Sequence, residues 1–235
     1  MRFLAAAPLV LLTLLPACSG PSAAAVVEPR AATGFTEIAL LGSADLVVRE
    51  GDRHEVNVLA EPERHERVIT RVEGNTLIVD TESEIQIMCI DCRSPVVEIT
   101  LPEMRALRID GSGDAQVVTE KPNAGVALGI QGSGSIHYRG RTAVLRVAID
   151  GSGDVDLAGA AGRLEATISG SGALDAQQLL AASGSFEVSG SGDMTVHLGG
   201  GDADFVIGGS GDIRWSGQAR VRRAIVDGSG EISRF

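Results

Sequence analysis

Apolar and polar residues alternate on both sides of a tripeptide that recurs through the second half of the chain. Gly-Ser-Gly begins at residues 111, 132, 151, 170, 190, 209 and 228, at intervals of 21, 19, 19, 20, 19 and 19. The residue two places before each copy is apolar: Ile109, Ile130, Ile149, Ile168, Val188, Ile207 and Val226. Apolar residues also stand four places after the first glycine, from Ala115 and Ile136 to Ile232. Each repeat therefore predicts a strand, a sharp corner and a second strand.

Two short strands cannot bury their inner faces alone, so the repeats are expected to stack. Stacking forms parallel ladders about 4.8 Å apart and aligns like residues in columns. The sequence thus predicts an all-β parallel β-helix with 19–21 residues per coil. Ile149, Ile168 and Ile207 should share an inner column, while Asp154 and Asp193 lie outside. Glycine suits the corners because it tolerates positive φ and close approach between coils.

The first part of the expected domain is less regular. We assign residues 34–235 to one β-helix domain, with irregular coils at 34–101 and Gly-Ser-Gly coils at 102–235. Alternating residues predict strands at 55–60, 75–80 and 95–101, and the stretch 61–72 predicts a helical turn.

The N-terminus has the pattern of an export signal. Arg2 precedes an apolar run from Phe3 to Leu15, and Pro16-Ala17-Cys18 resembles the end of a lipobox. We expect a signal peptide at residues 1–18, a lipid anchor on Cys18 that makes the membrane a partner, and a flexible tether at residues 19–33. Ordinary cleavage after Ala25 is the alternative. Either route predicts an exported protein. Acylation of Cys18 predicts a membrane-anchored lipoprotein in the periplasm or at the cell surface of a bacterium.

Charge and cysteine content narrow the partners. The net charge of -11 argues against binding nucleic acid. Acidic residues beside the corners, including the consecutive Asp193, Asp212 and Glu231, make a calcium-stabilised module an alternative, although no calcium motif is present and no cofactor is expected. In an oxidising compartment Cys89 and Cys92 are expected to form a disulfide. Zinc binding with His54 and His65, or redox chemistry, remains open for these cysteines.

Several segments together resemble a known bacterial family. They are the lipobox-like start, the strand unit from Phe35 to Val48, the segment from Val68 to Val79, the step from Leu101-Pro102 to Leu107, and the iterated Gly-Ser-Gly-Asp. Over residues 35–235 the chain resembles the putative auto-transporter adhesin, head GIN domain, a domain of unknown function. The resemblance implies a right-handed, single-stranded parallel β-helix, and it brings no catalytic residues with it.

We expect a non-catalytic envelope lipoprotein whose rigid solenoid binds an envelope protein or a glycan. No catalytic constellation stands out, because the acidic residues recur evenly and no serine, histidine and aspartate form a recognisable triad. The alternative is a polysaccharide-active enzyme, which rests on fold analogy alone. Such an enzyme needs acids that converge in a groove.

Overall fold

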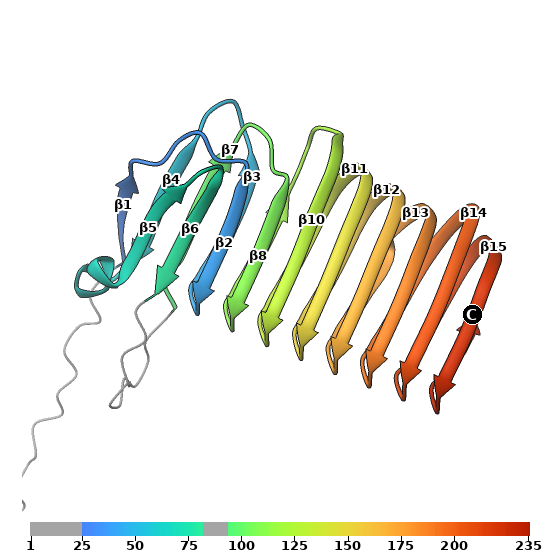
Figure 1. The fold of residues 1–235 in the computed structure, drawn as a ribbon. Coiled ribbons are helices and arrows are strands. Elements are labelled where there is room, and N and C mark those ends of the chain that lie inside the picture. The colour runs from blue at the N-terminus through green and yellow to red at the C-terminus, as the bar shows by residue number, and fades with distance from the viewer. Residues whose placement is uncertain (1–24, 82–93) are drawn as a thin grey trace, which may run out of the picture.

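The computed structural model describes residues 25–81 and 94–235 and has an all-β fold. Sixteen strands form one continuous sheet that winds into a β-solenoid of about seven turns, with about 19 residues per coil (Figure 1). The predicted fold class is therefore confirmed for the solenoid and its coil length. No helix within these two ranges is long and apolar enough to cross a membrane.

The Gly-Ser-Gly repeats build the regular coils. Their strands are β8 (Ala106–Gly111), β9 (Asp114–Val118), β10 (Asn123–Gly132), β11 (Ser135–Gly151), β12 (Asp154–Gly170), β13 (Ala173–Gly190), β14 (Asp193–Gly209), β15 (Ile213–Gly228) and β16 (Ile232–Arg234). Neighbouring coils pair in parallel, and each corner glycine faces the same glycine of the next coil, as Gly151 faces Gly170. Nearly equal repeat lengths favour this register, and a slip of one residue would turn the apolar face outward.

The corners of successive coils are in direct backbone contact. Gly170 has a φ of 132°, and the backbone amide of Ser171 donates to the carbonyl oxygen of Gly151 at 2.8 Å. A Cβ atom on Gly170 would lie only 2.2 Å from that oxygen. The two properties expected of these glycines, positive φ and close approach between coils, are both present.

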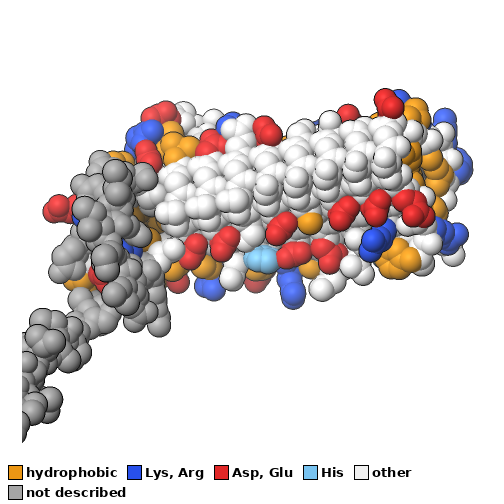
Figure 2. Space-filling view, turned by 90° about the horizontal axis from the view of Figure 1, so that it is seen from below, with side chains coloured by type: hydrophobic (Ala, Val, Ile, Leu, Met, Phe, Trp, Pro, Cys, Tyr) orange, Lys and Arg blue, Asp and Glu red, His pale blue; other side chains and the backbone are white. Residues whose placement is uncertain are grey.

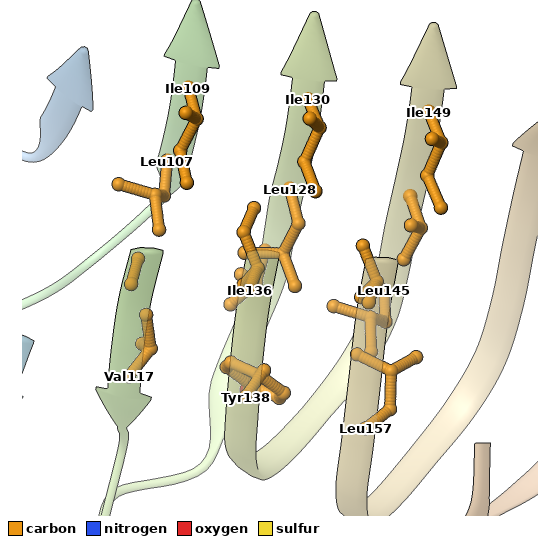
Figure 3. Close-up of a cluster of buried hydrophobic side chains, with 14 of the residues drawn as sticks. Leu107, Ile109, Val117, Leu128, Ile130, Ile136, Tyr138, Leu145, Ile149 and Leu157 are labelled. Carbon is orange, nitrogen blue, oxygen red and sulfur yellow. The ribbon is translucent and has the colours of Figure 1, made fainter. Parts of the chain in front are cut away.

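The core consists of the inner columns, which continue from coil to coil (Figure 3). Ile149, Ile168 and Ile207 are at most 2% exposed, whereas Asp154 and Asp193 face solvent. The predicted division between inner and outer columns is confirmed.

The N-terminal strands continue these ladders and then depart from them. β2 (Glu37–Gly42) and β3 (Asp45–Glu50) pair in parallel with β8 and β9. β6 (Thr76–Thr81) and β7 (Val96–Leu101) add one further parallel strand to each wall. The expected strands and the helical turn are present, the latter as the 3₁₀ helix η1 (Pro62–Arg67).

The interpretation of residues 34–101 as irregular coils was only partly right. β4 (Glu55–Ala60) runs antiparallel to β7, and β5 (Val68–Glu73) forms an antiparallel hairpin with β6. Gly74, with a φ of 62°, lies in the two-residue turn of that hairpin. A turn this short reverses the chain, and only an antiparallel partner can follow it.

The expected flexible tether at residues 19–33 is wrong for residues 26–30. β1 (Val26–Arg30) is a strand that pairs antiparallel with β4. The Arg30 guanidinium donates to the carbonyl oxygen of His65 at 2.8 Å and ties this strand to η1. Strand β1 covers the outer edge of β4, which would otherwise be open to aggregation. The predicted signal peptide and Cys18 lie outside the described residues.

Candidate binding groove on the outer wall

One wall of the solenoid carries a groove of about 450 Å³ across β9, β11, β12 and β13. Two adjacent columns of outward-facing residues border it. The first is Gln116, His137, Asp156 and Asp175, and the second is Val118, Arg139, Ala158 and Gln178. We call these eight residues the wall groove. Its volume falls in the range of ordinary ligand sites.

The hollow forms where a small residue interrupts a column of longer ones. Ala158 pairs in register with Arg139 on one side and Gln178 on the other, so its methyl group is the floor between two long side chains. The register also shifts between Asp156 and Ala158, where β13 carries the extra residue of the 20-residue repeat. The groove therefore lies at a break in the repeat.

A charged pair lies in the middle of the groove. The Nδ1 atom of His137 is 2.8 Å from Oδ2 of Asp156, and both side chains are about half exposed. This contact orients the imidazole and leaves Nε2 for another partner. On the next coil Asp175 accepts a hydrogen bond from the backbone amide of Gln177 at 2.9 Å, which holds the bulge in shape.

Other polar groups of the groove are unused by the fold. The side chains of Gln116, Arg139 and Gln178 make no hydrogen bond or ion pair with another described residue. Both glutamines can donate and accept, and the arginine donates in a fixed plane. The groove thus offers donors and acceptors side by side, with no strong excess of either.

The wall under the groove is rigid. Tyr138 is 2% exposed and shares a 3.0 Å hydrogen bond with the buried hydroxyl of Thr119. Burial raises the pKa of the Tyr138 phenol, which outweighs the lowering by the Thr119 hydrogen bond. The phenol therefore remains protonated at neutral pH and acts as a structural group.

Figure 2 shows a smooth face of corners bordered by a row of carboxylates, with a histidine among them. The aspartates that follow the corners do not cap their own turns. Instead the backbone amide of the next coil donates to each carboxylate, as Ala173 does to Asp154 at 3.2 Å and Glu231 to Asp212 at 2.9 Å. Parallel stacking brings the next coil closer than the residue's own turn. Among the described residues, no three or more His, Cys, Asp or Glu side chains are grouped to hold a metal ion.

One serine and one histidine do meet on the last coils. His197 Nδ1 lies 2.9 Å from Ser216 Oγ, a hydrogen bond between neighbouring coils. A catalytic triad also needs a carboxylate that orients the histidine. Within residues 25–81 and 94–235 no acid lies within ion-pairing distance of His197. The pair resembles the cross-strand contacts of ordinary sheets.

Cys89 and Cys92, the predicted disulfide, lie outside the described residues. His54, offered with them as a zinc ligand, has its Nε2 atom 2.8 Å from the carbonyl oxygen of Phe35. His65 is buried with its Nδ1 atom 3.3 Å from a carboxylate oxygen of Glu28. Both histidines therefore have neighbours in the fold itself.

A second hollow, of about 500 Å³, has a different character. It lies on the adjoining wall and is lined mainly by alanine and glycine, with the half-exposed Leu180 at its side. Arg141, Thr142 and Asn123 are its polar neighbours. This apolar hollow offers few hydrogen-bonding groups.

The fold and the groove define a repeat-built β-solenoid with a small polar groove on one wall. Residues 34–219 match the family model described as "Putative auto-transporter adhesin, head GIN domain". The chain belongs to this family, as the sequence resemblance predicted.

Solved structures agree on the fold. A putative adhesin from Bacteroides fragilis matches 92% of this chain and 99% of its own, with 20% identity and a TM-score of 0.78. A putative lipid binding protein from Parabacteroides distasonis matches 90% and 97%, with 21% identity and a TM-score of 0.69. A putative adhesin from the same species matches 91% and 98%, with 19% identity and a TM-score of 0.67. At these identities the likeness concerns the fold alone. None of the curated proteins that were compared matches the chain.

The wall groove was not predicted from the sequence. The sequence pattern gave no role to His137 or to Asp156. The available signal was the 20-residue interval between Gly170 and Gly190, which marks the bulge beside Ala158.

Proposed function

We propose that this protein is a non-catalytic lipoprotein of the bacterial cell envelope, held to the membrane through Cys18, whose solenoid binds an envelope protein or a glycan. The observation that carries this proposal is the wall groove. It interrupts a repetitive wall and places unused polar groups next to the oriented His137–Asp156 pair. Regular repeats are explained by the stacking of coils alone. A departure from the repeat is therefore where we expect functional residues.

Rigidity supports a binding role over a catalytic one. The groove lies on strands that are paired on both sides, so strand pairing fixes the backbone from which its side chains project. The family description as an adhesin points the same way. The polysaccharide-active alternative would need an acid and a base on either side of a bond. In the groove, Asp156 already contacts His137, and Asp175 holds its own bulge.

Binding can be tested with the full chain carrying Cys18→Ala, so that the exported protein stays soluble. It should sediment with washed bacterial envelopes in a saturable manner, and an Ala158→Gln variant that fills the groove should sediment less. No saturable sedimentation at any concentration would disprove the binding role. Release of reducing sugar from the envelopes would favour the enzyme.

Anchoring is tested separately by cell fractionation. Wild-type protein should pellet with membranes and enter the detergent phase, whereas Cys18→Ala should not. Wild-type protein that stays soluble without detergent would overturn the lipid anchor.

A second candidate function is lipid binding, favoured by the apolar hollow beside Leu180 and by the name of the Parabacteroides relative. Such a site would gain affinity from apolar surface removed from water. A fluorescent fatty acid should then bind wild-type protein, and Leu180→Asp should abolish the signal. Equal binding by Leu180→Asp would exclude this hollow.

A further inference from the structure

We infer that the wall groove binds a neutral glycan strand that lies across successive coils, with Ala158 as its floor and His137, Arg139 and Asp156 as its polar contacts. This inference rests on the proposed binding function and names the ligand class of that site. It follows from the charge, the spacing and the backbone pairing of the wall.

Charge argues against an anionic ligand. In the groove two carboxylates, Asp156 and Asp175, outnumber the one guanidinium, that of Arg139. The exposed carboxylates of Asp114 and Asp154 follow the same wall toward the corners, and the whole chain carries a net charge of -11. A phosphate or polyuronate strand would be repelled on approach. A strand without charge avoids this cost.

The mixture of donors and acceptors fits hydroxyl groups. Gln116 and Gln178 each present an amide with both functions, Arg139 donates, and Asp156 accepts. A hydroxyl group also donates and accepts, so neighbouring hydroxyls of one sugar can satisfy two such side chains at once. The methyl group of Ala158 and the exposed side chain of Val118 provide apolar contacts for sugar carbons.

Backbone pairing argues against an extended peptide. Peptides are commonly bound by adding a strand to a free sheet edge. β11 lies between β9 and β12, and β12 lies between β11 and β13, so the backbone groups under the groove are already paired. Recognition here must therefore use side chains alone.

The form of the groove favours a chain over a small molecule. Small-molecule sites usually enclose most of their ligand. The groove instead lies on the outer wall, and its side chains repeat about every 4.8 Å along the solenoid because each comes from the next coil. A ligand with repeating hydroxyl groups can contact several coils in succession, which a single sugar cannot do.

The test uses the full chain with Cys18→Ala, and titration calorimetry measures its binding to three neutral hexasaccharides: cello-, malto- and chitohexaose. The corresponding trisaccharides and a polygalacturonate hexamer serve for comparison. At least one neutral hexasaccharide should bind, about tenfold or more tighter than its trisaccharide and than the acidic hexamer, because the shorter chain loses contacts on outer coils.

Variants then locate the site. Ala158→Gln fills the hollow without removing a polar group and should weaken hexasaccharide binding about tenfold or more, and His137→Ala should weaken it less. Thr167→Gln is the matched control, because Thr167 is exposed on β12 and lies outside the groove, and it should bind like the unsubstituted chain. Equal weakening by Thr167→Gln, or no effect of Ala158→Gln, would overturn the assignment.

Competition separates this inference from the proposed function. Saturable envelope binding that a hexasaccharide competes away supports both. If envelopes bind but no neutral hexasaccharide binds or competes, the glycan is wrong while the binding role survives. Loss of envelope binding after protease treatment, with glycans intact, would assign the site to a protein. Absence of envelope binding and of hexasaccharide binding would reject both.

Discussion

Gly170 packs directly on the carbonyl oxygen of Gly151, one coil earlier, so closely that a Cβ atom on Gly170 would lie 2.2 Å from that oxygen. The same relationship recurs at the next corner, where a Cβ atom on Gly190 would lie 2.3 Å from the carbonyl oxygen of Gly170. Because the contact is between backbones, no side-chain movement can relieve a clash. The coils can stack at this distance only while both positions are glycine.

Gly170→Val is therefore expected to be among the most damaging single changes in the solenoid. Valine must adopt a φ of 132° and must also push two coils apart. The cost should be about 3 kcal/mol or more, measured as the free energy of unfolding in denaturant. Ser171→Ala, at the exposed middle of the same corner, should change stability by about 0.5 kcal/mol or less. Tolerance of the valine would mean that the coils do not stack through these corners.

Ile168→Ala tests the inner column. Ile168 is fully buried between Ile149 and Val188 of the adjacent coils, and the paired strands limit how far the neighbours can collapse into the space. Stability should fall by about 2 to 5 kcal/mol. Thr167→Ala, one residue away on the exposed face, should cost less than about 1 kcal/mol. Equal losses for the two variants in denaturant melts would contradict the inward direction of Ile168.

Asp154→Ala should have little effect despite the hydrogen bond that the carboxylate accepts. The backbone amide of Ala173 has Asp154 Oδ1 at 3.2 Å and the carbonyl oxygen of Gly153 at the same distance. Removing the carboxylate leaves this amide one acceptor, so the cost should stay under about 1 kcal/mol. The melts are measured with a chelator present, so that no bound cation contributes to stability. A larger loss would then show that the Asp154 carboxylate stabilises the fold by more than the one hydrogen bond described.

The regular coils could be predicted because each repeat carries its whole structure locally. The apolar column from Ile109 to Ile207 indicates which residues are buried. The corner glycines indicate where the backbone has positive φ. Stacking of the coils follows from these two features. The N-terminal strands were harder for a physical reason. Whether β4 lies beside a parallel or an antiparallel neighbour is decided by strands distant in sequence, and alternation looks the same in both cases.

The tether and the groove show two other limits. The segment from Val26 to Arg30 has a tether-like composition, but β4 offers an open edge that any extended segment can pair with. In the groove, Ala158 is unremarkable in an alanine-rich chain. It matters because register places it between Arg139 and Gln178, two residues about 20 positions away on either side.

Tyr138→Phe tests the support beneath the groove. The Tyr138 hydroxyl is a hydrogen-bond partner of Thr119, which is 5% exposed, and phenylalanine would leave the buried threonine hydroxyl without it. Stability should fall by about 1 to 3 kcal/mol. Adding Thr119→Val should recover part of this loss, because it removes the unsatisfied group. No recovery in the double variant would show that the phenol contributes through packing alone.

Asp45 should make the stability of the fold depend on pH. Its pKa is raised, mainly by partial burial and also by the nearby carboxylate of Asp114, although the backbone amide of Asp114 donates to Asp45 Oδ1 and lowers it. A raised pKa means that the folded state holds the proton more tightly than the unfolded chain does. The stability from this group is complete below the unfolded pKa near 3.8 and is lost as pH rises through the folded pKa.

Asp45→Asn removes the charge and keeps an oxygen that can accept from the amide of Asp114. The variant should therefore gain stability relative to the unsubstituted chain as pH rises from about 3 to 7, the interval in which carboxylates ionise. Asp154→Asn is the matched control, because its neighbours in the same column are Ser135 and Ala173 and no carboxylate repels it from an adjacent coil. Denaturant melts at both pH values should show a larger relative gain for Asp45→Asn than for the control. If Asp45→Asn instead loses stability as pH rises, the ionised carboxylate stabilises the fold and the repulsion between Asp45 and Asp114 does not govern this corner.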